Sequence, residues 1–239
     1  MERLPDDPHS DRRWRRRCEL SARKVVIWRH GRTAWNAQRR FQGHQDVALD
    51  HVGRTQAKLA ATTLATLEPY AIVSSDLQRA RLTAQALADA TGLAVQVDAN
   101  LRETFAGSWE GLSRSELERL HGQDLAAWAA GSDLAPGGGE RRSAVAKRMM
   151  NAIEGSLVGV PDDGVLIVVT HGGSARAAIG TMLGLPTDYW RMLGVLTNCA
   201  WCVLVENSPR PPGIDIWPRW RLLEYNARTL PEEAAADDR

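Results

Sequence analysis

The chain has 239 residues, of which 44% are hydrophobic and 25% charged, and its formal net charge at pH 7 is +1. These values are typical of one large globular domain, and they give no sign of the strongly basic surface of nucleic-acid-binding proteins. No run approaches the ~18 to 20 apolar residues of a membrane span, and the first twenty residues lack the apolar core of a secretory signal. We therefore expect a cytoplasmic protein without nucleic-acid or membrane partners.

The two ends of the chain differ in composition from the rest. Residues 1–22 combine prolines and aspartates with the basic run Arg12-Arg13-Trp14-Arg15-Arg16-Arg17, and the last residues are rich in Glu, Asp and Ala. We predict a disordered basic tail over 1–22, a single domain over 23–228 and a disordered acidic tail over 229–239. The basic run could contact nucleic acid or an anionic membrane, but we favour a solvated tail.

Between the tails, short apolar runs alternate with segments of helical period. Strands are predicted at 24–29, 71–74, 94–98 and 165–170, and helices at 53–67, 76–91, within 113–130, 140–157 and 173–183. This alternation predicts a three-layer α/β/α sandwich with a mostly parallel central sheet. Two last strands, about 198–206 and 218–225, have no helix between them and are expected to finish the sheet as an edge hairpin or to form an antiparallel pair.

The chain has three cysteines, too few and too unevenly placed for a disulfide framework, which agrees with a reducing compartment. Cys199 and Cys202 form a single C-x-x-C pair at the start of an apolar run. A metal site would need a second such pair or nearby histidines, so we predict buried packing and no bound metal. The apolar run 201–205 could pair between subunits as an edge strand, giving a homodimer, or be covered within the chain.

Two of the predicted buried strands each end in a histidine. Arg29-His30-Gly31 closes the strand at 24–29, and His171-Gly172-Gly173 follows the strand at 165–170. Ligands bind at the carboxyl edge of such a sheet, and the glycine after each histidine lets the backbone approach a ligand closely. Either histidine alone is typical of a structural residue, but the pair with its arginine predicts one phosphate site built by both strands.

An arginine reaches the same edge from another segment. Ser75 and Gln78 fit a capping box between a predicted strand and a predicted helix, which puts Arg79 in the first helical turn. There its planar guanidinium can bind two phosphate oxygens at once. Taken alone, Arg79 could equally be a surface arginine paired with Asp76.

A carboxylate reaches this edge as well. Glu103 lies in the loop after the strand at 94–98, followed by a glycine-containing segment. Beside phosphate and an aromatic wall its charged form would be disfavoured, so we predict a raised pKa suited to a general acid. The alternative is a solvent-exposed Glu103 paired with Arg102.

These segments together resemble the histidine phosphatase superfamily, also called the phosphoglycerate mutase-like family. The resemblance covers about residues 24–226 through Arg29-His30-Gly31-x-Thr33, Gly53-x-x-Gln56-Ala57, Ser74-Ser75-Asp76-Leu77-x-Arg79-Ala80-x-x-Thr83-Ala84, Leu101-x-Glu103 and His171-Gly172. It implies a phosphoglycerate mutase-like fold and phosphoryl transfer that needs neither a metal nor a cofactor.

The resemblance also implies a role for each catalytic candidate. His30 is expected to attack phosphorus and form a phosphohistidine, with its other ring nitrogen held by an acceptor such as a backbone carbonyl. Arg29, Arg79 and His171 are expected to neutralise charge on the transferring phosphoryl group. Glu103 is expected to protonate the leaving alcohol and then to draw a proton from the water that releases His30.

Further substrate contacts follow from family positions around the pocket. Asn36 and the Phe41-Gln42-Gly43 loop match lining positions, although Asn36 could equally cap the helix that it begins. Arg32 lies close to the nucleophile, and contacts are also expected from Gly172 and the catalytic residues Arg29, Arg79, Glu103 and His171. The segment 136–140 resembles a family loop with the pattern P-x-G-E-S, but Arg141 stands where serine is expected, so we assign this loop no role.

The segment after Glu103 lacks the tyrosine-containing motif typical of the family's mutases, and the chain lacks their longer insertion. We therefore expect a phosphomonoesterase of the phosphatase branch that acts on a small phosphorylated sugar or glycerate compound. A phosphoglycerate mutase of the same fold is one alternative. A catalytically silent module that binds a phospho-ligand or nucleic acid is another.

Overall fold

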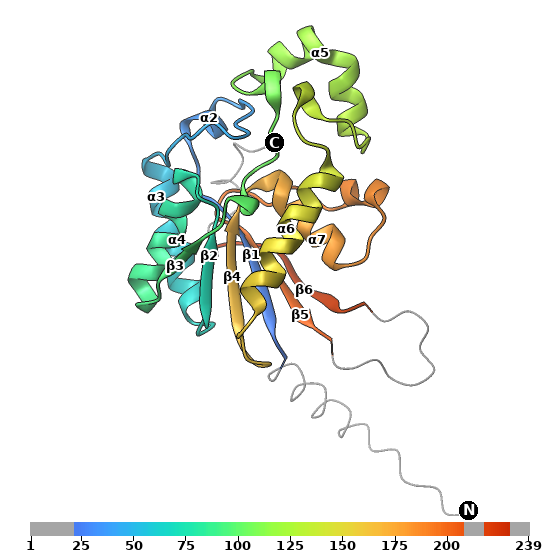
Figure 1. Ribbon diagram of the computed structural model, residues 1–239. Helices are drawn as coiled ribbons and strands as arrows, with labels where there is room; N and C mark the ends of the chain where they lie inside the picture. The colour runs from blue at the N-terminus through green and yellow to red at the C-terminus, as the bar shows by residue number, and fades with distance from the viewer. Residues whose placement is uncertain (1–21, 208–217, 230–239) are drawn as a thin grey trace, which may run out of the picture.

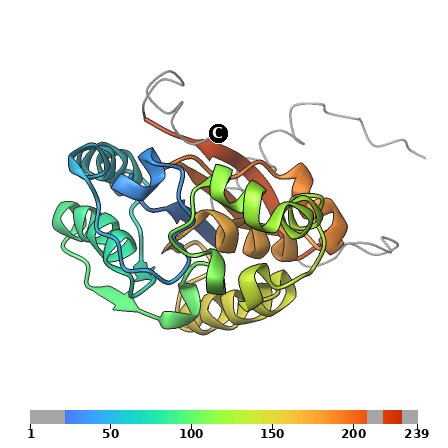
Figure 2. The same ribbon diagram turned by 90° about the horizontal axis from the view of Figure 1, so that it is seen from above.

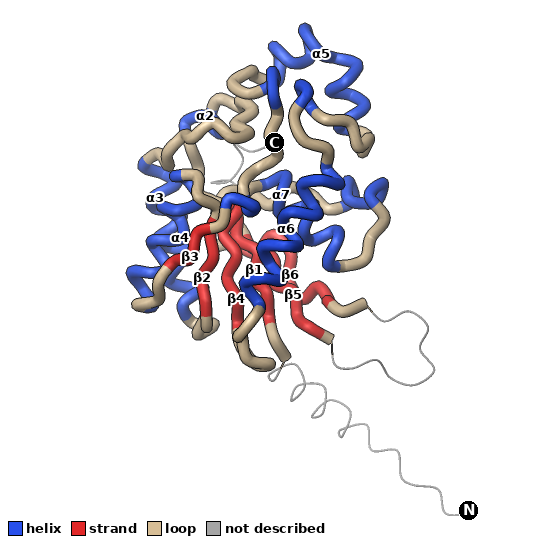
Figure 3. The backbone as a smooth tube through the Cα atoms, in the orientation of Figure 1, coloured by secondary structure: helices blue, strands red, loops and turns tan. Residues whose placement is uncertain are grey.

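A central sheet lies between two layers of helices in the computed structural model, which describes residues 22–207 and 218–229 (Figures 1 and 2). The predicted basic tail up to residue 21, the acidic tail from residue 230 and the loop 208–217 lie outside the described residues. Strands occupy the centre of the molecule in Figure 3, with helices around them. The predicted three-layer arrangement is confirmed.

The predicted strands and helices are all present, with ends that differ by about three residues or fewer. The strands are β1 (Lys24–Arg29), β2 (Ala71–Ser74), β3 (Val95–Val97), β4 (Val165–Thr170), β5 (Trp201–Glu206) and β6 (Trp220–Ala227). The α-helices are α2 (Ala34–Ala37), α3 (His51–Ala65), α4 (Gln78–Thr91), α5 (Arg114–Ala129), α6 (Arg142–Leu157) and α7 (Gly172–Met182). Short 3₁₀ helices are η1 (Ala99–Leu101), η2 (Gly107–Trp109), η3 (Pro136–Gly138) and η4 (Thr187–Met192).

The sheet has the strand order β3-β2-β4-β1-β5-β6. The first four strands are parallel, while β5 runs antiparallel to β1 and β6 antiparallel to β5. The last two strands thus finish the sheet as an antiparallel pair, as predicted. The hypothesis that 201–205 is an edge strand that pairs between subunits is wrong, because β1 and β6 already flank β5 on both sides.

Alternating side chains explain why the strands are apolar throughout. Val25 and Ile27 of β1 pack into the cluster formed with α6 and α7, whereas Val26 and Trp28 pack into the cluster formed with α3 and α4. A parallel sheet covered on both faces produces such continuous apolar runs. In the ladder, Arg29 pairs with Thr170, so the histidine that follows each of these strands reaches the same edge.

A third apolar cluster includes residues of α5, the helix at the top of Figure 1. Leu117 and Leu125 of α5 pack with Trp109, and Phe41 and Trp128 are packed against them. Phe41 meets both tryptophan rings edge-on, with ring centroids 5.8 Å and 5.6 Å away. Phe41 and Trp128 also line the pocket that contains His30, so this cluster supports one of its walls.

The start of α4 differs from the prediction. Its N-cap is Leu77, without a side-chain cap, and the Gln78 N–H donates instead to Asp46 Oδ1 at 2.7 Å, from a distant loop. The predicted capping box between Ser75 and Gln78 is therefore wrong. The Ser75 hydroxyl instead forms a hydrogen bond with His171 Nε2, at 2.9 Å.

Both cysteines of the C-x-x-C pair are buried free thiols, Cys202 within β5 and Cys199 just before it. Burial raises the pKa of both thiols, that of Cys202 to about 12, so they pack as apolar side chains. The described part of the chain holds no group of three His, Cys, Asp or Glu residues that could bind a metal. None of its helices is long and apolar enough to cross a membrane.

Gly53 in the first turn of α3 supports the segment that follows His30. A Cβ atom at this position would lie 2.0 Å from the Arg32 carbonyl oxygen. Because this is a backbone atom, relief of the clash would require a shift of the main chain. We expect Gly53→Ala to lower the free energy of unfolding by about 1–3 kcal/mol through overpacking. Urea unfolding measures this change.

Gly155→Ala in α6 is the control, because nothing lies within 4 Å of its added Cβ and the substitution should stabilise the helix by about 0.5–1 kcal/mol. Equal stability of the Gly53 variant and the wild type would contradict the prediction.

Candidate active site

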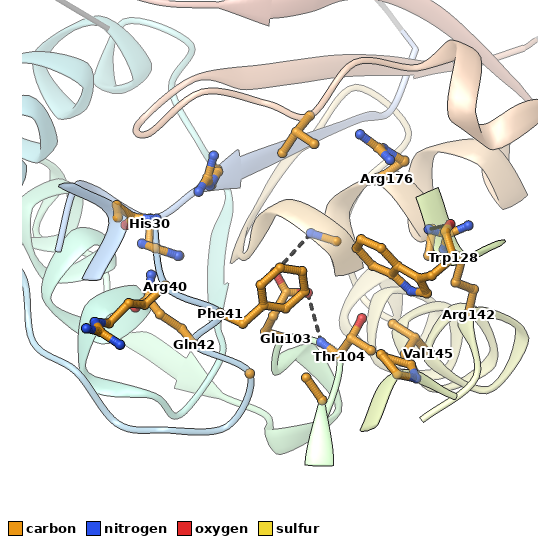
Figure 4. A pocket seen from close by; sticks show the side chains of 18 of the residues that line it. His30, Arg40, Phe41, Gln42, Glu103, Thr104, Trp128, Arg142, Val145 and Arg176 are labelled. Carbon is orange, nitrogen blue, oxygen red and sulfur yellow. Dashed lines mark hydrogen bonds between the residues drawn. The ribbon is translucent and has the colours of Figure 1, made fainter. Parts of the chain in front are cut away.

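His30 lies just after β1 and lines a pocket at the carboxyl edge of the sheet (Figure 4). Its backbone N–H donates to the Thr170 carbonyl and its own carbonyl accepts from the Cys199 N–H and from Asn198 Nδ2. The ring nitrogen Nδ1 lies 2.7 Å from the Gly31 carbonyl oxygen. A carbonyl only accepts, so Nδ1 carries the proton and Nε2 has the lone pair. The backbone carbonyl expected to hold this ring is confirmed.

Arg79 is fully buried in the first turn of α4. Its Nη1 and Nη2 donate to the carbonyls of Gln45 and Gly43 at 2.6 and 2.7 Å. Burial lowers the pKa of Arg79 to about 10, against the opposing effect of the Glu103 and Asp46 charges, so the group remains a cation at neutral pH. The alternative of a surface arginine is excluded.

Arg29, the last residue of β1, is the second guanidinium at this end of the pocket. It is buried, and its Nη1 donates to the Leu196 carbonyl at 2.6 Å. Two fixed cations therefore flank His30, an arrangement that suits a transferring phosphoryl group.

His171 lies behind His30 and precedes α7, with the two ring centroids 5.1 Å apart. Its Nδ1 accepts a hydrogen bond from Arg79 Nε at 3.1 Å, so its proton is on Nε2 and is donated to the Ser75 hydroxyl. The tautomer is the opposite of that of His30. His171 is completely buried and is not among the residues that line the pocket; it contacts the site through Arg79 and His30.

Both histidines are neutral at pH 7. Burial, followed by the charges of Arg79 and Arg29, lowers the pKa of His30 well below its ordinary value of 6.5, against the hydrogen bond to Gly31. Burial and Arg79 also lower the pKa of His171, with smaller effects from His30 and Arg29. A neutral imidazole with an unprotonated nitrogen is the form that acts as a nucleophile.

Glu103 caps the N-terminus of α7. Its carboxylate accepts hydrogen bonds from the backbone N–H groups of Gly173, Ser174 and Thr104, at 2.8–2.9 Å, and from the Ser174 hydroxyl at 3.0 Å. Figure 4 shows two of these contacts as dashed lines. Such a position is favourable for an anion.

Without a bound phosphate, the pKa of Glu103 is lowered, whereas the predicted rise was for a carboxylate beside phosphate. Desolvation alone would raise the pKa, but the N–H groups of Gly173 and Thr104, the charge of Arg79 and the Ser174 hydroxyl outweigh it, so the pKa lies below its ordinary value. The pairing of Glu103 with Arg102 is not observed either. Arg102 instead binds Asp76 through two hydrogen bonds.

The pocket is a cavity of about 190 Å³ with Arg29, His30, Arg79 and Glu103 at one end. Of the further predicted contacts, Asn36, Gln42 and Gly43 line it. Asn36 also serves in the capping box of α2, where its Oδ1 accepts from the Thr33 N–H. Asn36 therefore both lines the pocket and caps the helix, the two roles that the sequence left open.

Arg32 and Gly172 do not line the pocket. Arg32 Nε lies 2.9 Å from Asp50 Oδ2, at the start of α3. Gly172 is the first residue of α7, where a Cβ would meet Val195 at 2.8 Å. These two predicted residues stand next to the site rather than in it.

The outer wall of the pocket contains residues that the sequence did not single out: Arg40, Trp128, Arg142, Arg176 and Trp190. Arg176 could have been found, because on a helix it shares a face with Gly173, three residues earlier. The tryptophans and Arg142 come from segments without a motif, so no sequence signal marks them.

The loop 136–141, left without a role, closes over the segment after Glu103. Pro136 lines the pocket, and Glu140 accepts from the Phe105 N–H while it pairs with Arg148. Arg141 gives α6 no side-chain cap. Asp133 replaces the missing serine, because its Oδ1 accepts from the Ser143 N–H at 2.9 Å.

The two neutral histidines make stability depend on pH. Their pKa values lie well below 6.5 in the folded chain, so below about pH 6.5 the unfolded chain binds more protons and unfolding becomes more favourable. The contribution of the two histidines to the free energy of unfolding is fully present above that pH and is lost as the pH decreases. Between about pH 6.5 and 5.5 each histidine should cost about 1 kcal/mol.

Urea unfolding at both pH values tests this prediction. His30→Asn should lose about half of the dependence, whereas His51→Asn, at an exposed position in α3, should keep all of it. A stability that is constant over this range would mean that the histidines are not neutral in the folded chain.

The chain belongs to the histidine phosphatase superfamily, since residues 25–212 match the model of branch 1 of that superfamily. It is thus a phosphoric monoester hydrolase of the phosphoglycerate mutase-like fold, as the sequence predicted.

Its relatives include two curated glucosyl-3-phosphoglycerate phosphatases, from Mycolicibacterium vanbaalenii and Mycobacterium tuberculosis. Each is 38% identical over 216 residues, which cover 87% of this chain and 96% of the relative. A solved mycobacterial glucosyl-3-phosphoglycerate phosphatase in complex with VO₃ has a TM-score of 0.77 at 38% identity, covering 86% of this chain and all of that one. A probable phosphoglycerate mutase of Erwinia tasmaniensis is 35% identical over 181 residues, 74% of this chain. The sequence runs 53–57, 72–77, 97–104 and 220–222 already resemble the actinobacterial phosphatase.

Proposed function

We propose that this chain hydrolyses glucosyl-3-phosphoglycerate, or a closely related phosphorylated sugar or glycerate compound, through a phosphohistidine at His30. The observation that carries the proposal is the hydrogen bond from His30 Nδ1 to the Gly31 carbonyl, which leaves the Nε2 lone pair available beside Arg29 and Arg79. The substrate class is taken from the two phosphatase relatives, which the alignment covers over 96% of their length. The small number of cysteines in the chain, two of which are free thiols among the described residues, supports a cytoplasmic location.

In the first step, the Nε2 lone pair of His30 forms a bond to phosphorus as the bond from phosphorus to the alcohol oxygen breaks. The phosphorylated ring is cationic, and its Nδ1–H continues to donate to the Gly31 carbonyl. Arg29 and Arg79 neutralise charge on the phosphoryl oxygens. The alcohol oxygen leaves with a proton from Glu103.

In the second step, water attacks phosphorus and gives its proton to the Glu103 carboxylate, while the bond to Nε2 breaks and restores neutral His30. The pKa of Glu103 is low without a phosphate nearby. The negative charge of a bound phosphate acts in the opposite direction. A substrate that enters as the monoanion carries the proton that Glu103 then holds.

Release of inorganic phosphate from glucosyl-3-phosphoglycerate, with and without EDTA, tests the proposal. We expect turnover at the same rate, within about twofold, in both conditions, because the charge compensation comes from arginines. Complete loss of activity with the chelator would overturn the mechanism. Failure to hydrolyse any of a panel of phosphomonoesters would favour the silent binding module instead.

The mutase alternative is tested in the same preparation. A coupled assay follows conversion of 3-phosphoglycerate to 2-phosphoglycerate while released phosphate is measured in parallel. Hydrolysis that far exceeds transfer is the expected result. Transfer that exceeds hydrolysis would assign the chain to the mutases.

A further inference from the structure

One arginine in the pocket has no partner in the described part of the chain. Of the five arginines that line the cavity, four donate hydrogen bonds to backbone carbonyls: Arg29 to Leu196, Arg40 to Gly111, Arg79 to Gly43 and Gln45, and Arg142 to Trp128. Arg176 has no such bond and no ion pair, and its Nε is buried without a partner. The side chain as a whole is half-buried, and a charge with a shielded Nε and no counter-ion is arranged for a ligand in the pocket.

Arg176 lies across the pocket from the phosphate end. It comes from α7, on the helix face that also contributes Gly173 and Ala177 to the lining. Figure 4 shows Arg176, Trp128 and Arg142 on the side of the pocket opposite His30. The space between the two cationic ends is therefore the space that the body of a substrate would occupy.

Arg142 adds a second cation at this end. Its guanidinium lies over the Trp128 ring, 4.5 Å from the ring centroid, and its Nη2 donates to the Trp128 carbonyl at 2.7 Å. Burial and then the charge of Arg176 lower the pKa of Arg142, which is the signature of two like charges held close together. An anion between them would relieve that repulsion.

No carboxylate of the described residues takes this place. Glu103 is a nearby acid whose charge acts on Arg176, but its oxygens accept from the N–H groups of Gly173, Ser174 and Thr104. Asp133 acts on Arg142 and accepts from the N–H and hydroxyl of Ser143. The complementary charge has to come with the ligand.

We infer that Arg176, with Arg142 beside it, binds a carboxylate of the substrate, so that the pocket selects phosphomonoesters of hydroxycarboxylic acids. The inference rests on the proposed function, which places the phosphate at His30. A guanidinium can bind a carboxylate with two parallel hydrogen bonds. The aromatic side chain of Phe41, between the two ends, and that of Trp128, beside Arg142, line the pocket where the neutral part of the molecule would lie.

The test uses two substrates that differ in one group. 3-Phosphoglycerate and glycerol 3-phosphate carry the same phosphate on a three-carbon chain, with a carboxylate in the first and a hydroxymethyl group in the second. We expect the wild type to prefer 3-phosphoglycerate in kcat/KM by about 10- to 100-fold. Arg176→Gln should remove at least about tenfold of this preference, mainly through KM, and Arg176→Lys should restore part of it because the charge returns without the planar fork.

The matched control is Arg81→Gln, because Arg81 is an exposed arginine of α4. This variant should keep the wild-type preference. Melting curves of all variants establish that they are folded. An unchanged preference in folded Arg176→Gln would overturn the inference while leaving the proposed function intact. A second result would also overturn it. If Arg176→Gln kept the preference for 3-phosphoglycerate but lost a preference for a bisphosphate over the corresponding monophosphate, Arg176 and Arg142 would bind a second phosphate instead of a carboxylate. Absence of hydrolysis of both substrates by the wild type, and of glucosyl-3-phosphoglycerate, would instead reject the proposed function.

Discussion

Replacing His30 by alanine is expected to lower kcat for every phosphomonoester by at least about 10⁴-fold, because no other group of the pocket can take its place as nucleophile. The carbonyl of Gly31 fixes the tautomer of His30, and burial with Arg79 and Arg29 keeps its pKa low. His171 cannot substitute for it, since His171 Nδ1 is occupied by Arg79. Steady-state assays at high enzyme concentration measure the residual rate.

The matched control for this substitution is His51→Ala, on the exposed start of α3, which should retain wild-type activity. Inorganic phosphate should still bind His30→Ala in calorimetry, because Arg29 and Arg79 remain in place. A folded His30→Ala variant that keeps more than about one hundredth of the wild-type rate would show that another group attacks phosphorus.

Glu103→Gln is expected to reduce kcat for a glycerate or sugar phosphate by about 10²–10⁴-fold, the usual contribution of a general acid and base. An amide cannot transfer the proton in either step. With p-nitrophenyl phosphate, whose leaving group needs no proton, the first step should be spared and the second should not. Rapid-mixing experiments should then show a burst of p-nitrophenol close to one equivalent per enzyme molecule.

Glu118→Gln in α5 serves as the control, because its carboxylate is exposed and pairs with Arg114. A structural role of Glu103 at the start of α7 predicts a different outcome. It would slow both substrates equally and produce no burst, because the whole site would be displaced. That result would assign Glu103 to positioning rather than to proton transfer.

The layers of the fold could be predicted because each strand carries its own signal. Val25, Val26 and Ile27 are buried on alternating faces of the sheet, and only a strand covered on both sides needs such an uninterrupted apolar run. The end of the sheet was harder to assign. The apolar run of β5 is equally suited to an edge or an interior, and only the pairing with β1 and β6 decides between them.

The members of the site could be predicted for a similar reason. His30, Arg79, Glu103 and His171 each follow a strand or open a helix, and the carboxyl ends of parallel strands meet. Their partners could not be predicted. Asp46, which caps α4 from 32 residues away in the sequence, has no local signal.

The pKa of Glu103 shows the same limit in electrostatic terms. Its loop position suggested desolvation, which does act to raise the pKa. The opposing hydrogen bonds come from Gly173 and Ser174, about seventy residues further along the chain. The pKa of a side chain depends on the groups that surround it in space, and those groups become known only with the fold.

Trapping of the phosphorylated intermediate tests the central claim most directly. The enzyme is mixed with ³²P-labelled p-nitrophenyl phosphate, whose leaving group needs no proton, then quenched in alkali and digested, and the labelled peptide is sequenced by mass spectrometry. We predict a single acid-labile phosphoryl group on His30, absent from His30→Ala and accumulating in Glu103→Gln. A label on any other residue, or turnover without a labelled enzyme in Glu103→Gln, would contradict the account.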